Sequence, residues 1–255
     1  MITSRTNPLI KLARALRRGR ARHETGLFLV EGLQQVGAAI EAGWDVETII
    51  HAPELLASDF GRQVVSRFGG RLEEVSAPVF ASIAEKEHPT GILAIAKQRR
   101  GSFGSTAPFG CGAALVCPQD PGNVGTVLRT LDAVGGSALY LLDGGVDAYH
   151  PTTIRASMGA SFFIPVVEAS FTEFLDWRGT HEIQLIGTSA RAERNYREAR
   201  PAAPWILLLG SEQKGLSESH RAACDIVVSL PMRGRASSLN LGVAAGVLLF
   251  AFTDG

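Results

Sequence analysis

Three polar loops in the second half of the chain contain the residue types best suited to chemistry. Each loop follows an apolar run and precedes a helical stretch: residues 118–125 follow 113–116, residues 210–215 follow 205–209, and residues 231–240 follow 225–230. Where a strand of an α/β protein passes into a helix, backbone donors and acceptors face a small ligand. Each loop alone also fits a plain connection, so the three together carry the prediction of a ligand site.

The loops do not carry the common nucleotide-binding signatures. No Gly-x-Gly-x-x-Gly follows the first apolar run, which disfavours an ordinary dinucleotide-binding domain. Gly210 and Gly215 have the spacing of a phosphate-binding loop, but Leu216 and Ser217 stand where Lys and Ser or Thr are required. The six histidines and three cysteines lack ligand spacing, so we predict no metal.

Taken together, the loops resemble the three signature motifs of the SpoU (TrmH) family of RNA 2′-O-ribose methyltransferases, over roughly residues 110 to 255. The matching positions are Asn123, Gly125 and Arg129; Leu209, Gly210, Glu212 and Gly215; and Leu230, Pro231, Met232, Gly234, Ser238, Leu239 and Asn240. The resemblance implies transfer of a methyl group from S-adenosylmethionine to a ribose 2′-hydroxyl.

The resemblance also implies two sets of site residues. The cofactor-binding set that it implies is Leu209, Gly210, Leu230, Met232, Ser238 and Leu239. Gly234, in the third motif, and Thr188, at the end of a strand that enters the same edge, are added to this set. Glycine at 210 and 234 would allow the backbone to approach the ligand closely. The catalytic set is Asn123, Arg129, Glu212, Ser238 and Asn240. We expect Glu212 to order its loop and to orient Asn123 or Arg129.

Arg129 occupies the position of the arginine that the family is thought to use to activate the 2′-hydroxyl. A guanidinium has a pKa above about 12 and normally keeps its proton in proteins. We therefore expect Arg129 to hold the phosphate beside the target ribose and to lower the pKa of the hydroxyl electrostatically, with proton abstraction by Arg129 as the alternative.

The pattern of apolar runs predicts an α/β protein with two domains. From residue 110 onward, continuous apolar runs at 113–117, 138–142, 183–188, 205–209 and 226–230 alternate with helical stretches, as in a parallel sheet covered on both faces. The resemblance implies that this domain, 110–255, contains a trefoil knot. Residues 1–96 predict a smaller α/β unit, similar to the ribosomal-protein-like RNA-binding domain that precedes the catalytic domain in many family members. Residues 97–109 predict a linker.

The formal net charge is zero, yet seven basic residues precede the first acidic one, Glu24. Arginine along one segment supplies salt-dependent RNA affinity, although a solvated arginine face is the alternative. We predict RNA contacts by Arg5, Arg17, Arg18, Arg20 and Arg22, and by resemblance also by Arg129 and Arg155.

The composition, 45% hydrophobic and 20% charged, is that of an ordinary globular protein. No apolar window reaches the roughly 18 residues of a spanning helix, and the arginine-rich start is not a secretory signal, so we expect a cytoplasmic protein that does not span a membrane. The resemblance implies a homodimer acting on structured RNA, either tRNA or rRNA. Two alternatives remain: a non-catalytic RNA-binding scaffold, and a methyltransferase for a substrate other than RNA.

Overall fold

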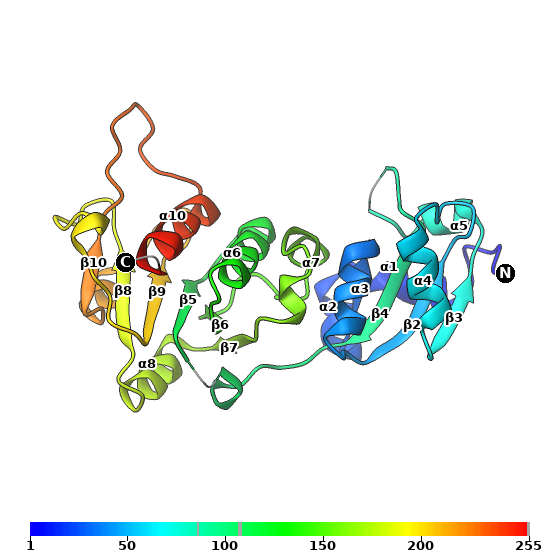
Figure 1. Cartoon of the computed structure of the whole chain (residues 1–255), viewed down its shortest axis with the longest axis horizontal. Coiled ribbons are helices and arrows are strands. Elements are labelled where there is room, and N and C mark those ends of the chain that lie inside the picture. The colour runs from blue at the N-terminus through cyan, green and yellow to red at the C-terminus, as the bar shows by residue number, and fades with distance from the viewer. Residues whose placement is uncertain (86, 107–108, 254–255) are drawn as a thin grey trace. The chain divides into compact units, whose positions relative to one another are not determined.

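The computed structural model describes residues 1–85, 87–106 and 109–253. The chain divides into two compact units, each described by itself below (Figure 1). The N-terminal unit contains residues 1–99 together with 149–162. The C-terminal unit contains residues 100–148 together with 163–255. The α/β fold predicted for both parts of the chain is confirmed.

The N-terminal unit is a four-stranded sheet of order β1-β4-β2-β3, in which only the β2–β3 pair is parallel. Along β4, Leu93 and Ile95 join the core on one face, while Ile92 and Ala94 join the core on the other. This alternation is the period of a strand buried on both sides. The elements are α1 (Pro8–Ala15), α2 (Gly19–Thr25), β1 (Leu27–Glu31), α3 (Leu33–Glu41), β2 (Val46–His51), α4 (Asp59–Arg67), β3 (Arg71–Glu74), α5 (Ala77–Ala81), β4 (Ile92–Lys97), α7 (Pro151–Ala156) and η2 (Ala160–Phe162).

Residues 149–162 pack in the N-terminal unit although the strand-helix pattern placed them in the domain 110–255. The Tyr149 ring lies 4.7 Å from that of Phe28 in a tilted arrangement, and the Trp44 indole donates to the Phe162 carbonyl at 2.9 Å. These contacts are long-range and aromatic, so periodicity along the chain carries no signal for them. The division at 97–109 therefore stays a prediction about domain boundaries.

The C-terminal unit is a six-stranded, wholly parallel sheet of order β10-β8-β9-β5-β6-β7. Five of its strands lie in the predicted apolar runs, and the sixth, β7, has only four residues. The elements are η1 (Phe103–Thr106), β5 (Cys111–Val116), α6 (Pro121–Ala133), β6 (Ala138–Leu142), β7 (Val166–Ala169), α8 (Phe171–Gly179), β8 (Gln184–Thr188), η3 (Tyr196–Glu198), β9 (Trp205–Leu209), α9 (Glu218–Ala222), β10 (Ile226–Val228) and α10 (Leu241–Thr253).

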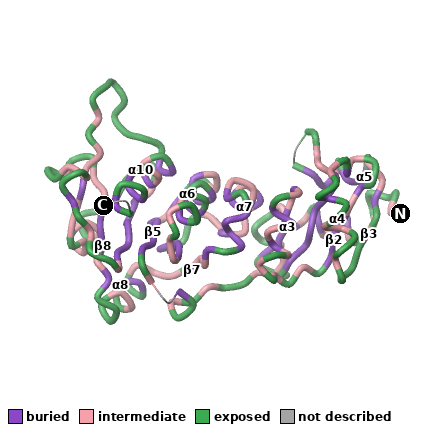
Figure 2. Tube along the Cα trace, in the orientation of Figure 1, coloured by how far each residue is buried: buried purple, intermediate pink, exposed green. Residues whose placement is uncertain are grey.

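Strand order explains why the three polar loops meet. The chain runs from β5 outward to β6 and β7, and then returns to build β8, β9 and β10 on the other side of β5. The carboxyl ends of β5 and β9 therefore lie side by side at a switch point, which is where parallel sheets bind ligands. The third loop follows β10, beyond β8, and returns toward them because it leads into α10, which packs against α6 and β9. Buried residues follow these strands, while residues 231–240 form an exposed excursion before α10 (Figure 2). The predicted trefoil knot stays a prediction.

In the described ranges, no helix is both long enough and apolar enough to cross a bilayer. Nor do the side chains described there include a group of three or more His, Cys, Asp or Glu arranged to hold a metal ion.

Candidate functional site

A chain of side-chain hydrogen bonds joins the three polar loops. The Asn240 amide nitrogen donates to Asn123 Oδ1 at 2.8 Å, and Asn123 Nδ2 donates to Glu212 Oε1 at 2.9 Å. These three residues are separated by 89 and 117 positions along the chain. Of the two partners expected for Glu212, the structure pairs it with Asn123.

Glu212 also accepts backbone hydrogen bonds from the first loop. The amide of Gln119 donates to Oε2 at 3.0 Å and that of Asp120 donates to Oε1 at 3.2 Å. Partial burial acts to raise the pKa of Glu212, but the hydrogen bonds from Asn123 and from these amides outweigh it and leave the pKa below its ordinary value. The carboxylate form therefore stabilises the joined loops.

Local sequence explains how each of the three residues is held. Asn123 lies in the first turn of α6, where Asp120 caps the helix and Pro121 occupies the first position, and its side chain is buried. Asn240 precedes α10 and its Oδ1 accepts from the Val243 amide at 3.3 Å, so it caps α10 while it ties the loops. Asn240 therefore combines the two roles of helix cap and link between loops.

The loop after β9 is closed by its own backbone. Gly215, at φ +63°, donates to the Ser211 carbonyl at 2.8 Å. A Cβ added at Gly210 would lie 2.0 Å from the Gly215 carbonyl carbon, a distance that no side chain tolerates. Glycine at 210 is therefore required for closure of the loop, a reason different from the approach of backbone to ligand expected from the sequence.

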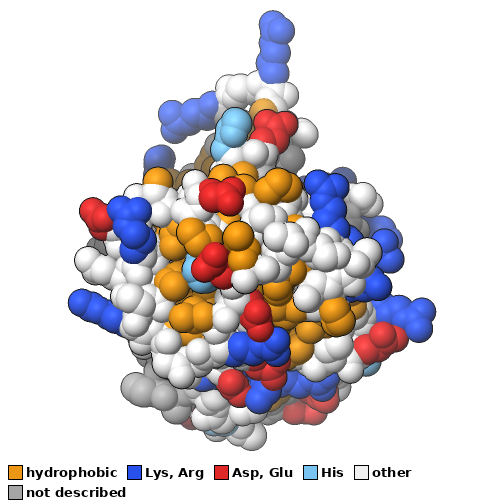
Figure 3. Space-filling view, turned by 90° about the vertical axis from the view of Figure 1, so that its right-hand side faces the viewer, with side chains coloured by type: hydrophobic (Ala, Val, Ile, Leu, Met, Phe, Trp, Pro, Cys, Tyr) orange, Lys and Arg blue, Asp and Glu red, His pale blue; other side chains and the backbone are white. Residues whose placement is uncertain are grey.

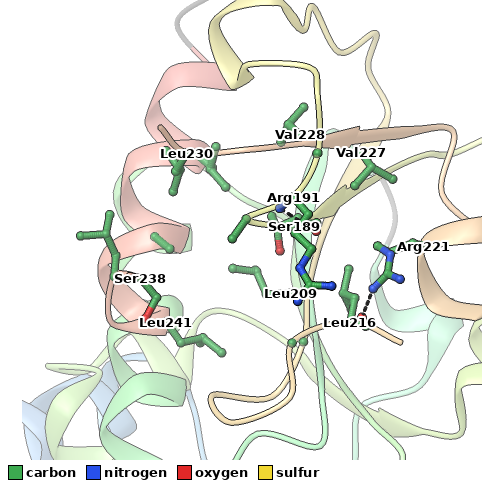
Figure 4. Close-up of a pocket in the computed structure, with 18 of the residues that line it drawn as sticks. Ser189, Arg191, Leu209, Leu216, Arg221, Val227, Val228, Leu230, Ser238 and Leu241 are labelled. Carbon is green, nitrogen blue, oxygen red and sulfur yellow. Dashed lines mark hydrogen bonds between the residues drawn. The ribbon is translucent and has the colours of Figure 1, made fainter. Parts of the chain in front are cut away.

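An open cavity of about 1250 Å³ lies beside this network. Its lining combines apolar side chains, among them Leu230, Leu241 and Leu248, with polar and charged groups of residues 188–194 and 210–215. Leu230 and Leu241 lie on the side opposite Arg191 and Arg221 (Figure 4). The Thr188 hydroxyl, at the end of β8, donates to the Leu208 carbonyl at 3.4 Å. Adenine and an amino-acid tail require such a combination of apolar and polar walls, and the volume exceeds the roughly 300–1,000 Å³ of ordinary small-molecule sites. The cavity therefore fits S-adenosylmethionine.

Most of the predicted cofactor-binding residues line this cavity, namely Thr188, Leu209, Gly210, Leu230, Met232, Ser238 and Leu239. Gly234 does not, and a Cβ built there meets nothing within 4 Å. Of the predicted catalytic set, Glu212, Ser238 and Asn240 line the cavity and Asn123 lies directly behind it through its bond to Glu212.

Arg129 lies on α6 outside the cavity lining, six positions after Asn123. Its side chain is exposed, and no hydrogen bond or ion pair engages it among the residues that the structure describes. An exposed and unpaired guanidinium is available to a phosphate of a large ligand.

The predicted RNA-contact arginines of the N-terminal unit differ in their environments. Arg22, which the sequence predicts to contact RNA, is 2% exposed and donates to the carbonyls of Leu16 and Arg17, so its guanidinium stabilises the turn between α1 and α2. Arg17 donates to the Ile83 carbonyl at 2.8 Å and Arg20 pairs with Glu24.

The remaining members are Arg5 and Arg18, which are exposed, and Arg155, which pairs with Glu85. In the face seen in Figure 3, Lys and Arg side chains stand mainly at the margins, around a middle where apolar side chains gather. Basic charge on this face is therefore dispersed.

The interpretation of the sequence overlooked the arginines at the polar end of the cavity. Arg191, Arg194 and Arg221 line it together with Lys214. Arg191 follows Thr188 and β8, at the same edge of the sheet as the three loops. Only the strand order places it there, because Arg191 belongs to none of the three motifs.

Comparison with known proteins identifies the family. Residues 112–250 match the model of the SpoU rRNA Methylase family, and residues 7–94 match an MRM3-like substrate binding domain. A 23S rRNA (uridine(2479)-2′-O)-methyltransferase of Streptomyces viridochromogenes is 30% identical over 98% of this chain and 90% of its own length. A 23S rRNA guanosine 2′-O-methyltransferase of Bacillus subtilis is 29% identical over 98% of this chain and 97% of its own.

Solved structures agree with these relatives. An AdoMet-bound rRNA methyltransferase from Sinorhizobium meliloti superposes with a TM-score of 0.89 at 33% identity, covering 99% of this chain and 97% of the other. The SpoU methyltransferase AviRb from Streptomyces viridochromogenes, also bound to AdoMet, superposes with a TM-score of 0.90 at 28% identity, covering 97% of both chains. The resemblance seen in the three loops is thus confirmed, and the chain belongs to the SpoU rRNA methylase family.

Proposed function

We propose that this protein transfers a methyl group from S-adenosylmethionine to a ribose 2′-hydroxyl of ribosomal RNA. The observation that carries the proposal is the Glu212–Asn123–Asn240 chain of hydrogen bonds, which holds three loops around a cavity suited to this cofactor. Relatives that span nearly the whole chain are named as 2′-O-methyltransferases of 23S rRNA, which favours that RNA as the substrate. The alternative of a non-catalytic scaffold has no support among them.

The cavity residues divide between holding the cofactor and holding the loops. Apolar side chains such as Leu230 and Leu241 would hold the adenine, and the Ser238 hydroxyl, which also lines the cavity, would orient the reacting groups. Both amide atoms of Asn123 are used within the network, so Asn123 and Asn240 are positioning residues. When bound, S-adenosylmethionine supplies a methyl group activated by the positive charge on its sulfur.

Arg129 acts on the RNA. Its exposed guanidinium holds the phosphate beside the target ribose, and its positive charge stabilises the oxygen of the 2′-hydroxyl as that oxygen loses its proton to solvent. A fixed cation is suited to this role because it remains charged throughout the reaction. Arg5, Arg18 and Arg20 add phosphate contacts from the N-terminal unit, and this unit binds the substrate RNA.

We also infer that the protein forms a homodimer and acts in the cytoplasm. Helix α10 supports the homodimer. Val243, Val247 and Phe250 lie at intervals of four and three residues, hence on one face of α10, and are 52%, 38% and 48% exposed. A second copy of the chain covers this stripe, since an exposed apolar helix face gains from burial.

Replacement of Arg129 by Ala tests the function. We expect methyl transfer from labelled S-adenosylmethionine to ribosomal RNA to fall by a factor of about 100 or more, the usual cost of losing one charge-stabilising group. Calorimetry is expected to show S-adenosylhomocysteine binding unchanged, because Arg129 lies outside the cavity lining.

The control is Arg197→Ala, which removes an exposed arginine that stacks on Tyr196 outside the cavity and is expected to keep full activity. Near-normal transfer by Arg129→Ala would contradict the role given to Arg129. Failure of the wild-type protein to bind S-adenosylhomocysteine would contradict the function itself.

A further inference from the structure

The polar end of the cavity is predominantly basic. Arg191, Arg194, Lys214 and Arg221 line it, against Glu193 and Glu212. The Glu212 carboxylate is already used by Asn123 and by two backbone amides. The excess of positive charge therefore faces whatever occupies this end.

The basic groups are not equally available to a ligand. Arg221 donates from Nη1 to the Leu216 carbonyl, so part of its guanidinium is committed to the protein. Arg191 extends from the segment after β8 toward Leu209 and Leu216, on the side of the cavity opposite Ser238 and Leu241 (Figure 4). Within the described part of the chain, no hydrogen bond or ion pair engages the Arg191 guanidinium.

The backbone around Arg191 is held in a defined turn. The Ser189 amide donates to the Val228 carbonyl at 3.0 Å, the Arg191 amide donates to Ser189 Oγ at 3.2 Å, and the Ala192 amide donates to the Ser189 carbonyl at 3.2 Å. The turn is thus anchored to β10 and closed by Ser189. The Cα of residue 191 is therefore held in place, and its side chain extends into the cavity.

We propose that Arg191 binds the carboxylate of the methionine tail of S-adenosylmethionine, an inference that rests on the proposed function. The sulfonium and the ammonium of this cofactor are both positive, so its carboxylate is the one group that a guanidinium in the cavity attracts. The planar fork of arginine matches a carboxylate with two parallel hydrogen bonds. Apolar contacts from α10 hold the adenine at the other end, and Arg191 fixes the tail.

The test compares two ligands that differ only in the carboxylate. Calorimetry measures the affinity of the full-length protein for S-adenosylhomocysteine and for its decarboxylated analogue, which keeps the adenosine, the sulfur and the amine. The wild-type protein is expected to prefer S-adenosylhomocysteine by roughly tenfold or more, the effect of a charge-assisted hydrogen bond. Arg191→Ala is expected to remove this preference by weakening S-adenosylhomocysteine alone.

Two further variants sharpen the result. Arg191→Lys keeps the charge but loses the fork, so an intermediate preference is expected. Arg197→Ala removes an exposed arginine outside the cavity lining and is expected to keep the wild-type preference. Unchanged binding of the decarboxylated analogue shows in each case that the cavity is intact.

Three results for Arg191→Ala would overturn the proposal. The variant could keep the preference for S-adenosylhomocysteine, or it could lose affinity for both ligands equally. It could also lose affinity for RNA with S-adenosylhomocysteine binding unchanged, which would assign Arg191 to an RNA phosphate. Each presupposes that the wild-type protein binds S-adenosylhomocysteine. Absence of that binding would instead contradict the proposed function.

Discussion

At the scale of single residues, Glu212 connects more of the site than any motif pattern indicates. Its two oxygens accept from the side chain of Asn123 and from the amides of Gln119 and Asp120. In Glu212→Gln, one acceptor becomes an amide donor that faces other donors. Because solvent reaches this carboxylate, we expect the free energy of unfolding to fall by about 1 kcal/mol. Denaturant titration measures this, and calorimetry is expected to show weaker S-adenosylhomocysteine binding.

The pH dependence of that difference is a second consequence of the same substitution. Because the pKa of Glu212 is lowered in the folded protein, its stabilising effect is complete above the ordinary value of 4.5 and is lost as the pH falls through the lowered pKa. The gap in unfolding free energy between wild type and Glu212→Gln should therefore be largest near neutral pH and shrink below about pH 4. Glu218→Gln, on an exposed carboxylate of α9, is the control, and a gap independent of pH would contradict the role of Glu212.

Residue types alone predicted the network only in part. Because polar residues followed three apolar runs, the loops were identified correctly, and Glu212 was expected to pair with Asn123 or Arg129. Only the distances select Asn123. The burial of Arg22 depends on how α2 turns back on α1, and an arginine count contains no information about that turn.

At the scale of elements, the loop after β9 owes its shape to one glycine. In Gly210→Ala, the new Cβ would meet backbone atoms of Gly215 and Leu216 at 2.0–2.3 Å, and backbone cannot move aside as a flexible side chain can. We expect a clear loss of thermal stability and loss of S-adenosylhomocysteine binding, because Glu212 lies in the distorted loop.

Gly234→Ala is the matched control at the element scale, since its Cβ would meet nothing within 4 Å. It is expected to bind S-adenosylhomocysteine within about twofold of wild type, well under the tenfold that 1.4 kcal/mol represents. Melting curves and calorimetry on the two variants decide the point. Equal losses in both would show that the two glycines share a role in binding, which the space around Gly234 argues against.

Element patterns predicted more than residue types did. Continuous apolar runs identified five strands of the parallel sheet, because burial on both faces requires apolar side chains at every position. Strand β7, with four residues at the sheet edge and a burial pattern of one buried position, carried too weak a signal. The packing of residues 149–162 in the N-terminal unit depends on rings of Phe28 and Trp44 that lie more than 100 positions away.

At the scale of the whole molecule, the order of strands converts separate loops into one site. The return of the chain past β5 places the end of β9 beside β5 and that of β8 beside β9, so residues 191 and 212 line one cavity while Asn123 lies behind it through its bond to Glu212. A single sequence indicates which segments are strands but not how they are ordered, and the order is visible only in the structure. The sequence alone therefore does not predict Arg191 as a site residue, because none of the three motifs contains it.

The exposed stripe of α10 leads to a prediction about assembly. Val247 lies between Val243 and Phe250 on a face that a second copy would bury. Val247→Glu places a carboxylate in the middle of that face, and burial of an unpaired charge is strongly unfavourable. We expect light scattering on a sizing column to give the mass of two chains for the wild-type protein and of one chain for the variant.

Leu72→Glu is the matched control, because Leu72 on β3 of the N-terminal unit is 39% exposed against 38% for Val247. It should keep the mass of two chains, which would show that an added surface charge alone does not dissociate the protein. If the dimer completes the methyl-transfer site, dissociation by Val247→Glu removes methyl-transfer activity. The melting temperature of this variant should stay near that of Leu72→Glu. A wild-type protein of single-chain mass, or a Val247→Glu variant of double mass, would instead assign the stripe on α10 to a role other than self-association.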